Sequence, residues 1–106
     1  TEFVAYARNN NHEIVSAEIS NEAEPIHSYS FNFRRNNILV VGQEETGIPV
    51  EILQSSKKVA IPMPGPGFCL NTSQTANIML YEAVKQFDNQ ERFLREWLEE
   101  ANIHHP

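Results

Sequence analysis

The chain of 106 residues is poor in cysteine, and it has no long apolar run. Cys69 is the only cysteine, so no disulfide can form within the chain, which is typical of a protein from a reducing compartment. No apolar run approaches the length of a membrane span, and the N-terminus has no signal-peptide pattern. We therefore expect a soluble cytoplasmic protein without a membrane partner.

Positive charge is also scarce. Eight Lys and Arg residues face fourteen Asp and Glu residues, which gives a net charge of −6. A protein that grips nucleic acid by general electrostatics needs a basic face, so this charge disfavours that class of protein. A local basic patch, or one supplied by another domain, is still compatible with the composition.

Glycine and proline are few, and they are concentrated in one part of the chain. All four glycines and four of the six prolines lie within residues 42–67. The rest of the chain has the composition of an ordinary globular domain, and its length suits a single domain over residues 1–106.

The apolar spacing predicts alternating helices and strands. In chain order the expected elements are a helix at residues 1–8, a strand at 12–19, a strand at 38–41, a short helix at 48–56, a strand at 58–62 and a helix from Asn71. Residues 20–37 are polar and rich in turn formers, and no element is assigned to them. The run at 38–41 is apolar on both faces, as in a central parallel strand covered by helices. The order predicts an α/β fold with a parallel sheet flanked by helices.

Two capping patterns occur in the C-terminal third. Asn71 is followed three residues later by Gln74, and Asp88 is followed likewise by Glu91. We therefore expect one helix from Asn71 and a separate terminal helix over residues 88–103. The apolar stripes of these helices are expected to pack in the core or across a dimer interface; they comprise Ala76, Met79, Leu80, Ala83, Val84, Phe87, Phe93, Leu94, Trp97, Leu98 and Ala101.

Both glycine-containing loops follow apolar strands, at the place where open α/β sheets bind ligands. The first loop, "GQEETGIP" at residues 42–49, has neither the GxGxxG spacing of a dinucleotide site nor the Lys-Ser/Thr of a P-loop. We expect a small-molecule site built largely from backbone groups.

Three motifs in order then suggest a family. They are Gly42, Glu44, Gly47 and Ile48; then Ile61, Pro62 and Met63; then Leu70, Asn71 and Ser73 at the head of a helix reading "ANIMLYEAVKQ". This constellation resembles the SpoU (TrmH-like) branch of the SPOUT methyltransferase superfamily, and the resemblance covers residues 37–87 well.

The resemblance implies a deep C-terminal trefoil knot at residues 37–87, with S-adenosyl-L-methionine held in the knot. Its cofactor-binding positions here would be Val41, Gly42, Gly47, Ile61, Met63, Leu70 and Asn71. The family transfers a methyl group to a ribose 2′-oxygen of tRNA or rRNA, usually as a homodimer. The matching catalytic candidates are Glu44, Asn71 and Ser73.

Plainer interpretations apply to several of these residues. Asn71 could be a helix cap only, and Glu44 an ordinary exposed loop carboxylate. A nucleophilic role for Cys69 is disfavoured, because no paired histidine is evident. His104 and His105 lack a ligand set, so no metal is expected.

The basic pairs at residues 34–35 and 57–58 are candidates for RNA backbone contacts, with surface solvation as the alternative. The family's first motif, an Asn-Arg pair on an upstream unit, has no counterpart in this sequence. We therefore expect the N-terminal part of the fold to be missing. The alternative function is a non-catalytic module that binds cofactor or RNA or mediates dimerisation.

Overall fold

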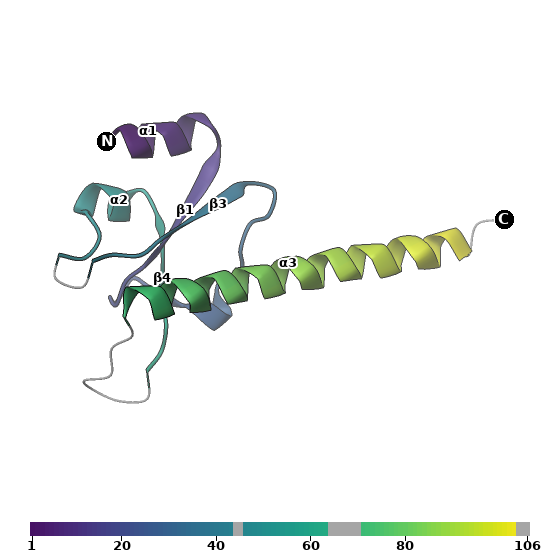
Figure 1. Cartoon of the computed structure of the whole chain (residues 1–106). Coiled ribbons are helices and arrows are strands. Elements are labelled where there is room, and N and C mark those ends of the chain that lie inside the picture. Colours follow the sequence, from purple (N-terminus) through teal and green to yellow (C-terminus); the bar gives the residue numbers. More distant parts are fainter. Residues whose placement is uncertain (44–45, 64–70, 104–106) are drawn as a thin grey trace.

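The computed structural model describes residues 1–43, 46–63 and 71–103, and Figure 1 shows the arrangement of its elements. The elements are α1 (Glu2–Asn9), β1 (His12–Ala17), β2 (Glu24–Pro25), a 3-10 turn η1 (Ile26–Ser28), β3 (Asn36–Val40), α2 (Val50–Gln54), β4 (Lys57–Ala60) and α3 (Thr72–Ile103). The predicted α/β alternation is confirmed. The predicted knot depends on residues 64–70, which lie outside the described residues, so it stays a prediction.

The strands form one parallel sheet in the order β2-β4-β1-β3. β1 lies between β4 and β3, with Ile14 beside Ile38 and Val15 beside Lys57. Ile14 and Val15 point to opposite faces of the sheet, and both are buried. A strand that is apolar on both faces is thus at the centre of the sheet.

The predicted central position of the strand at 38–41 is wrong. β3 is an edge strand of the described sheet, and its residues Ile38 to Val40 are only partly buried. A continuous apolar run shows that both faces are covered, but it does not distinguish a central strand from an edge strand. The predicted short helix begins at Val50, and Pro49 precedes it as the N-cap residue.

The core lies between the sheet and the first half of α3. Its fully buried members come from four segments of the chain; they are Val15, Ile26, Phe31, Val59 and Met79. Aromatic rings extend this core along α3: Phe31 stacks with Phe33, which meets Phe87 edge-on at 5.4 Å between ring centroids. The segment to which the sequence assigned no element therefore supplies core residues.

The capping box at the start of α3 is confirmed. The Gln74 amide N–H donates to Asn71 Oδ1 at 2.8 Å, and the Asn71 amide N–H donates to Gln74 Oε1 at 3.1 Å. The predicted break before residues 88–103 is wrong, because α3 continues to Ile103. Neither glycine nor proline interrupts this stretch, and Asp88 accepts a hydrogen bond from Arg92 at 2.8 Å instead of capping.

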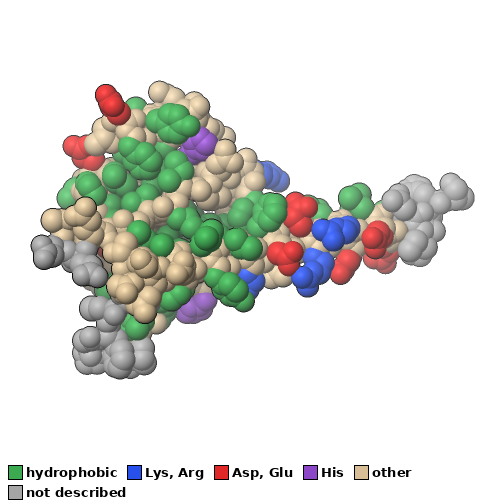
Figure 2. Space-filling model, viewed as in Figure 1, with side chains coloured by type: hydrophobic (Ala, Val, Ile, Leu, Met, Phe, Trp, Pro, Cys, Tyr) green, Lys and Arg blue, Asp and Glu red, His purple; other side chains and the backbone are tan. Residues whose placement is uncertain are grey.

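Beyond the body, α3 protrudes, and the molecule measures 62 Å along its longest axis (Figure 1). On the face shown in Figure 2, acidic and basic side chains gather on this protruding half. The predicted core stripe is right for Met79, which is fully buried. Leu80 and Val84 of the same stripe are 55% and 56% exposed, so they do not pack in the core of this chain, and their place in a dimer interface stays a prediction.

Gln86 joins α3 to the segment that follows η1. Its Oε1 accepts from the Phe31 amide at 3.0 Å, and its Nε2 donates to the Tyr29 carbonyl at 2.8 Å. One turn earlier, Glu82 accepts from the Lys85 ammonium at 2.8 Å, which holds the pKa of the Glu82 carboxyl below its usual range. A single amide side chain thus satisfies two backbone groups of a segment that has no sheet partner there.

Replacing Gln86 by alanine tests this bridge. Gln86→Ala leaves the Phe31 amide and the Tyr29 carbonyl unpaired in a partly buried place, and it should lower the free energy of unfolding by about 2 kcal/mol. Urea titration measures the change. Gln90→Ala, at an exposed position on the same helix, should change the free energy by less than about 0.5 kcal/mol. Equal effects of the two substitutions would contradict the bridging role.

Candidate functional site

A cavity of about 310 Å³ opens at the carboxyl edge of the sheet. The ends of β1, β3 and β4 meet there, and the first turn of α3 closes one side. Its described lining residues are Ala17, Glu18, Ile19, Val41, Gly42, Gln43, Gly47, Ile48, Val59, Ala60, Ile61, Met63, Thr72 and Thr75. The cavity therefore lies where parallel sheets bind ligands.

A tight loop after β3 shapes one wall of the cavity. The Gly47 amide donates to the Gln43 carbonyl at 2.9 Å, which folds the chain back on itself. A Cβ on Gly42 would lie 2.6 Å from the Gly47 carbonyl carbon and 2.8 Å from the Ile48 nitrogen. Only glycine permits so close an approach of two backbones. Gly47 has a φ of 70°, in the left-handed region that side chains disfavour.

Thr72 ties α3 to this loop. Its Oγ1 donates to the Gly42 carbonyl at 2.9 Å, across 30 residues of sequence. The capping box one residue earlier fixes the start of the helix at the same place. The loop after β3 and the N-terminal turn of α3 are therefore held together as one wall.

The structure brings together part of the predicted site. Val41, Gly42, Gly47, Ile61 and Met63 all line the cavity. The remaining predicted residues fall into two groups. Glu44 and Leu70 lie outside the described residues. Asn71 and Ser73 are exposed at the rim and do not line the cavity, and the Asn71 side chain is engaged in the capping box.

Sequence analysis missed Glu18, Thr72 and Thr75, which also line the cavity. The Glu18 amide donates to the Val59 carbonyl at 2.9 Å, so β1 stays paired with β4 up to the rim of the cavity. The sequence gives no signal for Glu18, because the predicted strand at 12–19 includes it, whereas β1 ends at Ala17. Thr72 lies next to Asn71, inside the motif that was recognised.

The cavity wall is mainly apolar, with main-chain groups at the loop. Ala60 and Ile61 suit a flat aromatic ring system, while Val41, Gly42, Gln43 and Gly47 offer backbone donors and acceptors. Glu18 is the one ionisable side chain among the described lining residues. Such a wall suits a neutral base attached to a polar group.

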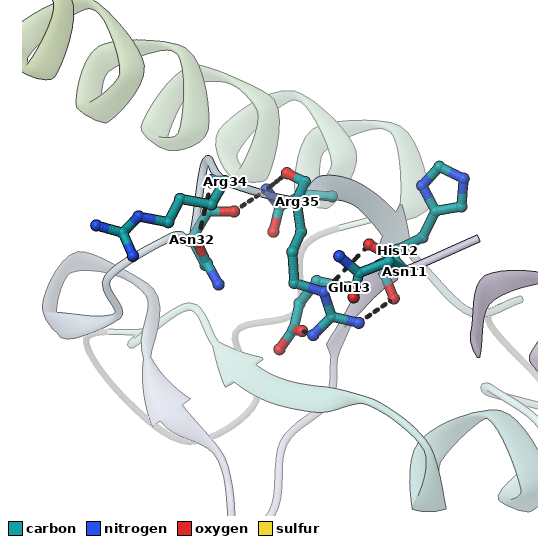
Figure 3. A network of polar contacts seen from close by, with 7 residues as sticks. Asn11, His12, Glu13, Asn32, Arg34 and Arg35 are labelled. Carbon is teal, nitrogen blue, oxygen red and sulfur yellow. Dashed lines mark hydrogen bonds and ion pairs between the residues drawn. The ribbon is translucent and has the colours of Figure 1, made fainter. Parts of the chain in front are cut away.

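A separate polar cluster occupies the opposite, amino end of β1, and Figure 3 shows it from close by. The Arg35 guanidinium forms an ion pair with Glu13 and donates to the carbonyls of Asn11 at 3.1 Å and His12 at 2.8 Å. Arg34 points away from this network. Because Arg35 is neutralised inside the fold, the pair at 34–35 offers one exposed cation for the predicted RNA contact.

In the second basic pair, Lys58 is also paired, with Glu22 at 3.3 Å, while Lys57 is exposed. Across residues 1–43, 46–63 and 71–103, no three potential metal-ligating side chains gather into a group. None of the helices in these ranges is long and apolar enough to cross a membrane.

Comparison with known proteins decides the family. Residues 1–81 match the family described as SpoU rRNA Methylase. The chain belongs to this family. It is also 33% identical over 97 residues to the tRNA (guanosine(18)-2′-O)-methyltransferase of Aquifex aeolicus, a match that covers 91% of this chain and 45% of that protein. This SpoU-family chain thus spans less than half the length of that curated relative.

Solved structures of SpoU proteins share the fold. The TrmH/SpoU tRNA modifying enzyme of A. aeolicus superposes with a TM-score of 0.72 at 27% identity, covering 94% of this chain and 57% of that one. The SpoU methyltransferase AviRb of Streptomyces viridochromogenes, in complex with AdoMet, superposes with a TM-score of 0.64 at 26% identity. That match covers 80% of this chain and 32% of AviRb. The predicted SpoU-type sheet and flanking helices are confirmed.

Alanine substitutions at Gly42 and Gly47 distinguish the cost of a steric clash with the backbone from the cost of a positive φ. Gly42→Ala forces a methyl group into the Gly47–Ile48 backbone and should lower the free energy of unfolding by about 3 kcal/mol, since overpacking against backbone cannot relax easily. Gly47→Ala meets no atom within 4 Å and should cost about 1 kcal/mol, from its positive φ alone. Urea titration of both variants measures the difference. A Gly47→Ala cost equal to or greater than that of Gly42→Ala would contradict this geometry.

Proposed function

We propose that this chain forms the cofactor-binding part of an S-adenosyl-L-methionine-dependent methyltransferase that acts on a ribose 2′-OH of tRNA or rRNA. The observation that carries the proposal is the cavity at the carboxyl edge of the sheet, where the motif at residues 42–48 and the motif at residues 61–63 converge on one opening. Membership of the SpoU family and the likeness to an AdoMet-bound structure support it.

The residues of the cavity fit this cofactor. The close backbone approach at Gly42 keeps side chains out of the opening, so main-chain groups can reach a ligand directly. The apolar wall of Ala60 and Ile61 would cover the adenine ring. When bound, the cofactor supplies a methyl group on a sulfonium. Val41, Gly47 and Met63 would hold it, together with Leu70 and Asn71.

The RNA ribose would meet the rim at the start of α3. Ser73 is exposed there and directly follows Thr72, which lines the cavity. A 2′-hydroxyl is a weak nucleophile at neutral pH, so the site must position it and favour loss of its proton. Ser73 and Asn71 would orient the ribose by hydrogen bonds, and Glu44 would act from the loop after β3. We also propose that the protein is cytoplasmic; an RNA substrate and the single cysteine, which is typical of a reducing compartment, support this proposal.

A transfer assay tests this function. The full-length protein is incubated with methyl-labelled S-adenosylmethionine and unmodified tRNA or rRNA transcripts, and the label is scored in nucleotides that resist alkaline hydrolysis. We expect labelled 2′-O-methyl nucleotides, and Ser73→Ala should lower the rate about tenfold by loss of one hydrogen bond to the reacting group. Ser30→Ala, at an exposed site in the segment after η1, is the matched control.

Cofactor binding without any transfer to RNA would contradict the catalytic proposal and favour the non-catalytic module. Unchanged transfer by the Ser73→Ala variant would overturn the role of Ser73 alone.

We also propose that the protein is a homodimer joined along α3. One side of this helix carries an exposed apolar seam with a spacing of three and four residues; its members are Leu80, Val84, Phe87, Leu94 and Leu98. Leu94 and Leu98 lie in the protruding half and are 52% and 53% exposed. This spacing is the heptad pattern by which two helices pack together.

Charge favours a second copy of this chain in the antiparallel direction. Glu91 falls within the seam, so a parallel pair would bring two like charges face to face. An antiparallel pair places Glu91 opposite Leu94 of the second copy. It also brings Asp88, on the flank of the seam, beside Arg95 of the second copy, and the two-fold axis repeats this contact. The seam is then covered and the flanking charges are complementary.

Charge reversal tests the dimer. Asp88→Arg faces Arg95 with a like charge and should raise the dimer dissociation constant about tenfold, whereas Asp88→Arg combined with Arg95→Asp should restore it. Multi-angle light scattering over a concentration series measures the mass, and circular dichroism controls for helix content. A monomeric wild-type chain, or a double variant as weak as the single one, would contradict the antiparallel pair.

A further inference from the structure

Glu18 is the one ionisable residue among the described lining residues of the cavity, and it lies outside the family motifs. It follows the last residue of β1 and lines the cavity together with its neighbours Ala17 and Ile19. The side chain is partly buried, and no ion pair or side-chain hydrogen bond of Glu18 occurs within the described part of the chain. A carboxylate at the rim of a mainly apolar cavity keeps its acceptor atoms available for a ligand.

The backbone at Glu18 is fixed. Its amide donates to the Val59 carbonyl at 2.9 Å, which continues the pairing of β1 with β4 up to the cavity. Because Val59 is fully buried, this pairing anchors the residue to the core. The carboxylate is therefore carried by the rigid sheet and not by one of the loops.

The neighbouring wall limits which part of a nucleoside Glu18 can reach. Ala60 and Ile61 provide the apolar surface on which a base would lie, and they belong to the end of β4, which pairs with β1, and to its extension. The ribose of a nucleoside is bonded directly to its base, while any charged group on the 5′ side lies several bonds further. A carboxylate offers two oxygens, so it can accept from both hydroxyls of a vicinal diol.

We propose that the Glu18 carboxylate binds the cofactor by accepting hydrogen bonds from the 2′- and 3′-hydroxyls of its ribose. The inference rests on the proposed function, because it takes the occupant of the cavity to be an adenosine derivative. It adds a cofactor-binding residue that directly follows β1 to the two motifs that line the cavity. Glu18 thereby selects nucleosides with an intact ribose diol.

Calorimetric titration of the chain with two probes tests this role. The probes are S-adenosylmethionine and 5′-methylthioadenosine, which keeps the base and ribose but has no charge. Glu18→Gln should weaken both by a similar factor of about ten, since a charge-assisted hydrogen bond is replaced by a neutral one. Glu2→Gln, with the same change of net charge at the exposed start of α1, should leave both affinities unchanged.

A change in the ligand tests the same ribose contact without a substitution in the protein. The 2′-deoxy analogue of 5′-methylthioadenosine should bind the wild-type chain about tenfold more weakly than the parent compound. In the Glu18→Gln variant, the loss of the 2′-hydroxyl should cost much less, because its acceptor is already impaired. This measurement with the wild type holds even where the variant does not fold.

Three results would overturn the inference. Equal affinities of the wild type for 5′-methylthioadenosine and its 2′-deoxy analogue would contradict the proposed hydrogen bond to the 2′-hydroxyl. Weakened binding of S-adenosylmethionine alone in the variant would place Glu18 against the positive charge. Failure of the wild type to bind either parent probe would overturn the proposed function together with this inference.

Discussion

The close contact between Gly42 and the Gly47–Ile48 backbone is the constraint on which the cavity depends. A Cβ on Gly42 would lie 2.6 Å from the Gly47 carbonyl carbon, so no side chain fits at residue 42. Thr72 then joins the same Gly42 to the start of α3 through its hydroxyl. One glycine therefore links the end of a strand, a loop and a helix at the wall of the cavity.

α3 has two parts with different roles. Its first half packs on the core through Met79 and is fastened to the segment after η1 by Gln86. Its second half makes no such contact within the described residues and carries apolar and charged side chains together (Figure 2). The first half holds the cavity in place, while the second half is available for a partner. In the proposed dimer, this helix would connect the proposed cofactor site to the interface.

Much of this arrangement could be predicted from the sequence, because local signals are strong there. The β1 pattern, the capping box at Asn71 and the glycine loop each depend on neighbouring residues, and each was recognised. The sequence did not reveal that β3 lies at an edge, since pairing depends on distant segments. A second capping pattern at Asp88 was misleading, because the same residue also forms a helical ion pair with Arg92. Glu18 was missed because it matches no motif and reaches the cavity only through sheet register.

The central claim is that the cavity at the carboxyl edge of the sheet holds the cofactor. Titration of the ¹⁵N-labelled chain with S-adenosylhomocysteine, followed by amide shifts, tests it most directly. The account predicts saturable shifts at Gly42, Ile48 and Thr72 around the cavity. Shifts centred on Glu13 and Arg35 at the opposite end of β1, or no shifts in a folded chain, would contradict it.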